Sequence, residues 1–223
     1  VLIALVNSHS RLTDRGQIFE YVFVAWLVGF LLTSHERRGR SSFIAPLVVQ
    51  LAWVQLHSSF LLGPVLAAIF FLSEWIAPRT GVTRALAPHD WKRAVLLVAM
   101  MALVCVVNPN PKAFLIQPFD PVQRELLMRY TLEWKSPFDP AMMSGNFHPY
   151  YELLLGAAAV AVLLRLGSLP LAPVALMLAT AILSFQSHRL RVEFALVAVP
   201  MIALLVRDAP LAASPFHAIQ VAA

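Results

Sequence analysis

The stretch Gln50–Gly63, QLAWVQLHSSFLLG, lies at the centre of an apolar run that extends from Phe43 to Ala77. Glu74 is the one acidic residue in that run. A helix needs about 20 residues to cross a bilayer, so a run of this length predicts two crossings. The residues Gln55 to Ser59 form the polar break at which the chain has to turn. We therefore expect His57 to lie at a turn near one membrane face.

Composition places the chain among integral membrane proteins. Of its 223 residues, 59% are hydrophobic and 13% are charged, whereas a soluble domain carries about 25% charged residues. The formal net charge of +5 comes from basic residues in short loops, so we attribute it to topology and membrane lipids, with no nucleic acid as partner. The single cysteine, Cys105, excludes an internal disulfide and a cysteine-based metal centre. We expect no metal and no cofactor.

The predicted fold class is all-α: a polytopic transmembrane helical bundle that forms one domain over residues 1–223. We expect about seven crossings, over residues 17–33, 43–56, 60–76, 94–107, 150–164, 171–185 and 192–206. The chain starts at Val1, inside an apolar segment. We therefore expect it to be the C-terminal part of a longer protein.

The stretches between these crossings carry local signals of their own. Residues 108–148 form the one long hydrophilic segment, and the spacing of Gln123–Glu133 predicts a short helix that lies on the membrane surface or caps the bundle. Prolines and a glycine in Pro78–Arg93 predict a loop without helix. Near the end of that loop, Asp90 is placed to cap the next helix.

Orientation follows from the lysines and arginines of the short loops. One set of alternate loops holds Arg37, Arg38, Arg40, Arg79, Arg84, Lys92, Arg93, Arg165 and Arg207. The other set holds Arg11, Arg15, Arg189 and Arg191. The first set is richer and is predicted to face the cytoplasm, so the second set and the long hydrophilic segment face outward.

Polar residues gather on the predicted outer side, and charges at a bilayer often mark sites. The candidate binding residues are His57, Arg189, Arg191, Glu133, Trp134, Lys135, Asn108, Arg15 and Gln17. Each has a structural alternative: the histidine as a solvated turn, the arginines as partners of lipid headgroups, the asparagine as a helix stop. Glu20 and Glu193 lie near the outer ends of their crossings, where either can pair with an outer arginine.

Five short motifs carry a resemblance to a known family. They are RGQIF at 15–19, similar to R-P-Q-[LI]-F; WVQLHSSFLLG at 53–63, similar to W-x-N-L-H-G-[GS]-F-x-x-G; VNPN at 107–110, similar to L-N-P-[YH]-G; EWKSP at 133–137, similar to E-W-x-S-P; and HRLRVEFA at 188–195, similar to a helix start R-x-x-x-[LF]-[FA]. The series resembles bacterial polytopic membrane proteins related to the GT-C glycosyltransferases, among them dolichyl-phosphate-mannose-type and lipopolysaccharide-core transferases. Gly16, Gln55 and Ser58 depart from the pattern.

The resemblance implies an inverting transfer of a sugar from a polyprenyl-phosphate donor, on the outer side of the bacterial inner membrane. Arg189 and Arg191 would neutralise the lipid phosphate, His57 would line the pocket as a wall and hinge, and Glu133–Lys135 would cap it near the acceptor. The family's catalytic acid lies in a first outer loop, which here would precede Val1, so the catalytic residue is unknown. The alternative is a non-enzymatic transporter or assembly scaffold, whose inverted repeat or broken midplane helices are not visible in this sequence.

Overall fold

The computed structural model describes residues 17–33, 41–80, 83–84, 90–108, 116, 120–140, 149–166 and 169–207. The regular structure there is almost entirely helical, which confirms the predicted all-α class. The α-helices are α2 (Gln17–Thr33), α3 (Ser41–Leu56), α4 (Leu62–Thr80), α5 (Trp91–Val104), α7 (Pro121–Tyr130), α9 (Pro149–Leu163), α10 (Leu171–Gln186) and α11 (Arg191–Arg207). Three 3-10 helices connect or extend them: η2 (Ser58–Leu61), η4 (Leu132–Trp134) and η6 (His188–Leu190).

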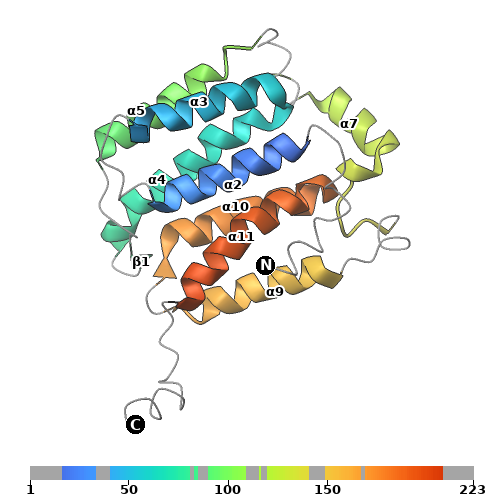
Figure 1. The fold of residues 1–223 in the computed structure, drawn as a ribbon. Coiled ribbons are helices and arrows are strands. Elements are labelled where there is room, and N and C mark those ends of the chain that lie inside the picture. The colour runs from blue at the N-terminus through green and yellow to red at the C-terminus, as the bar shows by residue number, and fades with distance from the viewer. Residues whose placement is uncertain are drawn as a thin grey trace, which may run out of the picture.

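The long helices lie side by side in a bundle (Figure 1). Helices α2, α4, α10 and α11 form its centre, with α3 and α5 against one side and α9 against the other. Buried alanines on the two helices that share the largest contact, Ala172 and Ala181 on α10 and Ala195 and Ala198 on α11, allow their backbones to approach closely.

The stretch Gln50–Gly63 forms a helical hairpin, as the sequence predicts. Helix α3 ends at Leu56, and η2 begins at Ser58, so the chain turns at His57. Gln50 is buried and donates from Nε2 to the carbonyl oxygen of Phe60 at 2.9 Å. A Cβ atom at Gly63 would overlap the Gln50 side-chain oxygen, so the glycine permits this close approach.

The two ends of the bundle differ. The two-residue strands β1 (Thr83–Arg84) and β2 (Leu169–Pro170) pair in parallel and join the loop after α4 to the loop before α10. The sequence assigns both of these loops to the cytoplasmic side. The turn at His57 and the turn between α10 and α11 lie together at the opposite end of the bundle, as Figure 1 shows.

The prediction that a loop begins at Pro78 is wrong for its first residues, because α4 continues through Pro78 to Thr80. Proline's fixed φ suits a helix, and near a helix end it disturbs only the last turn. Side chains satisfy carbonyl groups of that turn: Arg79 donates to the carbonyl of Trp75, and Thr80 Oγ1 donates to that of Ala77 at 3.0 Å. The predicted cap is confirmed, since Asp90 Oδ1 accepts from the backbone N–H of Arg93 at 3.3 Å.

The helix predicted over Gln123–Glu133 is shifted toward the N-terminus and is shorter. Helix α7 begins at Pro121 and ends at Tyr130, and after Thr131 the chain continues as η4. Asp120 sets the start, because its Oδ1 accepts from the backbone N–H of Val122 at 3.0 Å beside a proline that fits the first helical position.

The apolar helices bear on the membrane prediction. Among the described residues, the segment Ser58–Thr80 alone is both long enough and apolar enough to cross a membrane. Shorter apolar helices cover Gln17–Thr33, Phe43–Leu56, Pro149–Leu163 and Leu171–Gln186. The structure thus supports an apolar helical bundle with one helix of membrane-spanning length.

Candidate functional site

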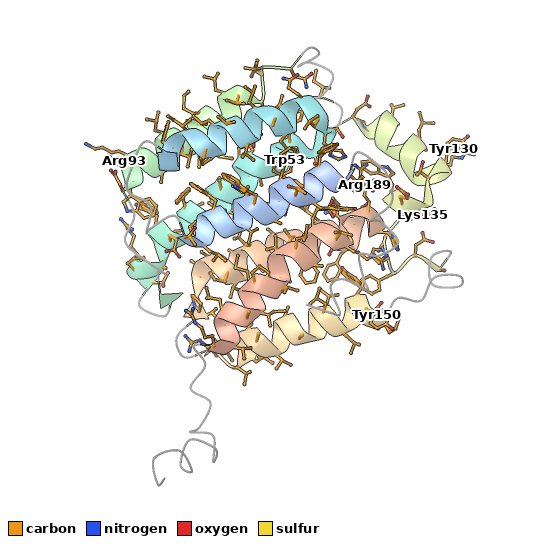
Figure 2. The ribbon with its side chains drawn as sticks, viewed as in Figure 1. Trp53, Arg93, Tyr130, Lys135, Tyr150 and Arg189 are labelled. Atoms are coloured by element: carbon orange, nitrogen blue, oxygen red, sulfur yellow. The ribbon has the colours of Figure 1, made fainter. Side chains whose placement is uncertain are left out.

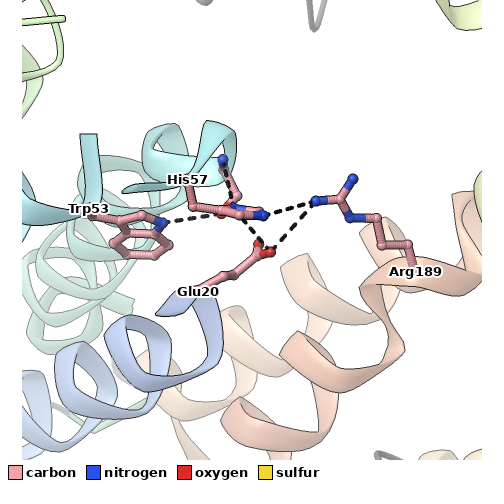
Figure 3. A network of polar contacts seen from close by, with 5 residues as sticks. Glu20, Trp53, His57 and Arg189 are labelled. Carbon is pink, nitrogen blue, oxygen red and sulfur yellow. Dashed lines mark hydrogen bonds and ion pairs between the residues drawn. The ribbon is translucent and has the colours of Figure 1, made fainter. Parts of the chain in front are cut away.

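A polar cluster lies at the end of the bundle where the two helix turns meet. The first turn carries His57, the second carries Arg189, and the first turn of α2 contributes Glu20 between them (Figure 3). Segments far apart in the sequence therefore supply one site. Figure 2 shows that Arg189 and Lys135 lie at the end of the bundle opposite Arg93.

The first turn fixes the orientation of the His57 ring. His57 is the N-cap of η2 and has an extended backbone (φ −153°, ψ 143°), and its Nδ1 accepts from the backbone N–H of Ser59. Ser59 Oγ lies 2.8 Å from the same nitrogen and accepts from Trp53 Nε1 at 3.1 Å. Because Trp53 is buried, this chain of contacts ties the imidazole to the core.

Glu20, His57 and Arg189 form a triangle of close contacts, drawn in Figure 3. Nδ1 of His57 lies 3.3 Å from Glu20 Oε2, and its Nε2 lies 3.2 Å from Arg189 Nη2. The third side, from Arg189 Nη2 to Glu20 Oε2, is 3.9 Å. The Glu20 side chain is 1% exposed and that of Arg189 is 19% exposed, so the triangle runs from the interior to the surface.

The surroundings of His57 keep its imidazole neutral at pH 7. Burial lowers its pKa below the usual 6.5, and the positive charge of Arg189 lowers it further, while the negative charge of Glu20 acts in the opposite direction. A neutral imidazole has one nitrogen that accepts a hydrogen bond and one that donates.

Glu193, in the first turn of α11, adds a second buried carboxylate. It is close enough to Glu20 and Arg189 for their charges to interact. The Glu193 and Glu20 carboxyl groups lie within hydrogen-bonding reach of each other. The predicted pairing of an outer arginine with one of these two acids is confirmed for Glu20.

A small pocket lies next to Glu193. It has a volume of about 10 Å³, room for about one water molecule, and is lined by Leu62, Leu66, Thr180, Leu183, Leu190 and Glu193. The lining is mostly aliphatic and includes the Thr180 hydroxyl and the Glu193 carboxyl group.

The segment after α7 covers the cluster. The guanidinium of Arg189 lies 5.6 Å from the ring centre of Trp134, a cation–π distance. Two hydrogen bonds hold the segment to the second turn: Ser187 Oγ donates to the carbonyl of Glu133 at 2.9 Å, and the backbone N–H of His188 donates to that of Lys135 at 2.8 Å. The candidates Glu133, Trp134 and Lys135 thus lie against the turn that carries Arg189.

The other candidates have different surroundings. Arg191 is 2% exposed, packs its guanidinium 5.7 Å from the ring centre of Tyr151, and donates to the carbonyl of His188. Asn108 donates from Nδ2 to the carbonyl of Val54 at 3.0 Å and so ties the end of α5 to α3. Gln17 is buried at the start of α2. Arg15 lies outside the described residues.

Sequence reasoning leaves Glu20 out of the candidate site and gives it only a pairing role. The signal that identifies it is an acid three residues after Gln17 in an otherwise apolar helix, a spacing that puts both side chains on one face. Which turn that face meets depends on how the helices pack. In the described residues no group of three or more histidine, cysteine, aspartate or glutamate side chains is arranged to hold a metal ion.

Comparisons with protein-family models, with curated proteins and with solved structures found no match to this chain.

Proposed function

We propose that this chain is the C-terminal membrane part of a glycosyltransferase-like protein that takes a sugar from a polyprenyl-phosphate donor on the extracytoplasmic side of the bacterial inner membrane. The observation that carries the proposal is the meeting of His57, Arg189 and Trp134 at one end of an apolar helical bundle. In this function Arg189 binds the donor phosphate, and His57 and Trp134 line the site.

The bundle surface supports a multi-pass membrane protein with about seven crossings. Large apolar side chains are exposed along the outer faces of several long helices, where a soluble protein carries polar residues. They include Ile44, Val48, Val95, Leu103, Leu153, Val160 and Leu178. Lipid tails are the solvent that such a surface suits, and the phosphate-binding end then lies at the outer membrane face.

Arg189 has the properties that phosphate recognition needs. A guanidinium presents five N–H donors in a planar fork that fits two phosphate oxygens at once. In the described contacts, Arg189 has one partner within hydrogen-bonding distance, His57, and a longer ion pair with Glu20. Its side chain is 19% exposed, so the remaining donors can reach a ligand from the surface.

Apolar surface near the polar end supports a donor with a hydrocarbon tail. Val122, Leu126 and Tyr130 of α7 are exposed, and Trp134 of η4, which follows α7, lies over the Arg189 guanidinium. A prenyl chain that lies against this surface would bring its phosphate to the arginine.

The proposal is tested by binding of decaprenyl phosphate to the intact protein in lipid nanodiscs. We expect Arg189→Ala to weaken binding by about tenfold or more, because a charge-assisted contact contributes roughly 1.5–3 kcal/mol. Arg93→Ala is the matched control: it removes the same charge at the opposite end of the bundle, where Arg93 pairs only with Asp90 among its described ion pairs. Equal affinity of the wild-type protein and the Arg189→Ala variant, or no binding at all, would overturn the proposal.

A further inference from the structure

Helix α7 carries a stripe of exposed apolar side chains. Figure 1 shows the helix at the polar end, outside the bundle and tilted across the direction of the long helices. Among the described elements it packs chiefly against η4, which follows it in the chain. Successive members of the stripe are four residues apart, so they share one side of the helix. This apolar stripe consists of Val122, Leu126 and Tyr130.

A row of charged residues lies beside the apolar stripe. Glu125 and Arg129 are also four residues apart, and both are exposed. With about 100° of rotation per residue, these two fall on one side of Val122, while Leu126 and Tyr130 fall on the other. An apolar and a charged row along one helix are typical of helices that lie in the surface of a bilayer, where the first row meets acyl chains and the second meets headgroups.

The apolar surface of the bundle continues to the same end. Leu56 at the end of α3, and Val106 and Val107 after α5, are exposed. They lie close to the first turn, since Gln55 Nε2 donates to the carbonyl of Val107 at 2.6 Å. Lipid that covers these side chains therefore reaches the end of the bundle at which α7 lies.

Two tyrosines mark the same level. Tyr130 of α7 and Tyr150 of α9 are exposed, and Figure 2 shows both at the polar end with Lys135 and Arg189. Tyrosine is enriched where acyl chains meet headgroups, because its ring is apolar and its hydroxyl is polar. The apolar partner that suits the stripe is thus the lipid that surrounds this end of the bundle.

The segment after α7 is fixed to the bundle. The ring centre of Phe138 lies 6.1 Å from that of Tyr151 in α9 and 5.7 Å from that of Phe185 in α10. Two hydrogen bonds hold the same segment to the second turn. Because a single residue separates α7 from η4, the position of α7 acts directly on Trp134, which covers Arg189.

We propose that α7 anchors the polar end of the protein in the lipid surface. The apolar stripe lies among the outer parts of the acyl chains, the charged row faces the headgroups, and the anchored helix holds Trp134 over Arg189. The inference rests on the part of the proposed function that places the polar end at a membrane surface. It gives α7 a task there: the guanidinium is kept at the depth of the headgroup phosphates, where a polyprenyl phosphate presents its own.

The first test measures the surroundings of the stripe in the intact protein in lipid nanodiscs. The chain has a single cysteine, so Cys105→Ala gives a background in which one introduced cysteine carries a spin label. Oxygen concentrates in lipid, whereas a charged nickel complex stays in water. We expect oxygen to reach labels at Val122→Cys, Leu126→Cys and Tyr130→Cys more readily than the nickel complex does. Glu125→Cys is the matched control on the charged row, and the nickel complex should reach its label more readily.

Two results of this test would overturn the anchor. One is equal accessibility of the Leu126→Cys and Glu125→Cys labels to the nickel complex. The other is shielding of the stripe from both reagents, because protein, such as a second copy of the chain, would then cover it. Binding of decaprenyl phosphate in the same nanodiscs is measured separately. A lipid-exposed stripe without binding would overturn the proposed function and leave the anchor standing, and a water-exposed stripe with binding would do the reverse.

The second test measures the link between α7 and Trp134. Leu126→Glu places a charge on the apolar stripe, so α7 should withdraw from the lipid and loosen η4. We expect increased quenching of Trp134 fluorescence by acrylamide in nanodiscs, isolated by companion variants that carry Trp134→Phe. Glu125→Gln is the control, and it should leave the quenching unchanged. Equal quenching of Trp134 in the Leu126→Glu and Glu125→Gln variants would overturn the link to Arg189.

Discussion

The two helix turns at the polar end have similar backbones, but their side chains form hydrogen bonds with different parts of the molecule. Each joins two long helices through a 3-10 helix that follows a residue in extended conformation, His57 in one turn and Ser187 in the other. In the first turn the side chains bond to each other: His57, Ser59 and Trp53 form one chain of contacts. In the second turn, Ser187 makes no side-chain cap and bonds outward to the carbonyl of Glu133.

The two arginines at the second turn, Arg189 and Arg191, have different surroundings. Arg189 reaches across to the first turn and has a partly exposed side chain, whereas Arg191 stays buried against Tyr151 and His188. The family resemblance implies a phosphate-binding role for both. Two residues apart in the chain, they separate because one belongs to η6 and the other begins α11. The difference teaches that position in the turn, and not residue type, distinguishes the partly exposed arginine from the buried one.

Arg191→Ala is the substitution with the largest expected effect on stability. It removes a buried guanidinium and leaves a cavity beside Tyr151, so the free energy of unfolding should fall by about 3 kcal/mol. Arg189→Ala should cost only about 1 kcal/mol, because that side chain is partly exposed and Glu20 keeps His57 as a partner. Thermal unfolding in detergent measures both. A larger loss of unfolding free energy in Arg189→Ala than in Arg191→Ala would contradict the structural role of Arg191.

Gly63→Ala tests how the first turn is held. The new methyl group would overlap Gln50, which donates to the carbonyl of Phe60 in η2, so we expect a loss of about 2 kcal/mol in unfolding free energy. Gly156→Ala in α9 is the matched control, because nothing lies within 4 Å of the added atom. It should be neutral or stabilising by up to about 1 kcal/mol. Similar melting temperatures for the two variants would contradict the close approach at Gly63.

The fold could be predicted from the sequence further than the site could. Long apolar runs and their polar breaks gave the helices, and the range 17–33 matches α2 at both ends. Local chemistry also identified the turn at His57. The ends of α4 and α7 were missed because carbonyl contacts from Arg79 and Thr80, and the capping of Val122 by Asp120, decide them.

The contacts that form the site could be identified only from the tertiary structure. His57 and Arg189 are 132 positions apart, and no local pattern indicates that they touch. Glu20 illustrates the difficulty best. Its sequence signal is one acid in an apolar helix, and its role follows only from the packing of α2 between the two turns. Whether these residues transfer a sugar stays a prediction.

Ser59→Ala and Ser187→Ala are a matched pair of variants. The first removes the contacts of Ser59 with His57 and Trp53, and the second removes the hydrogen bond from Ser187 to the carbonyl of Glu133. Each removes one hydroxyl and should cost about 1 kcal/mol of unfolding free energy. We expect only Ser187→Ala to increase quenching of Trp134 fluorescence by acrylamide, because its hydroxyl holds the neighbouring Glu133. Variants with Trp134 replaced by phenylalanine isolate that signal. Increased Trp134 quenching in Ser59→Ala would show that the first turn also holds the covering segment.

The smallest expected effect is a dependence of stability on pH that belongs to the first turn. The pKa of His57 in the folded protein is below 6.5, mainly through burial and also through Arg189, so the unfolded chain binds a proton there more tightly. The stabilisation is fully present above about pH 6.5 and is lost as the pH falls below that value toward the folded pKa. The melting temperature of the wild-type protein should therefore fall from pH 7 to pH 5 more than that of His57→Gln. Because Arg189 contributes to the low pKa, Arg189→Ala should reduce the same dependence, and an undiminished dependence in both variants would place its origin outside the first turn.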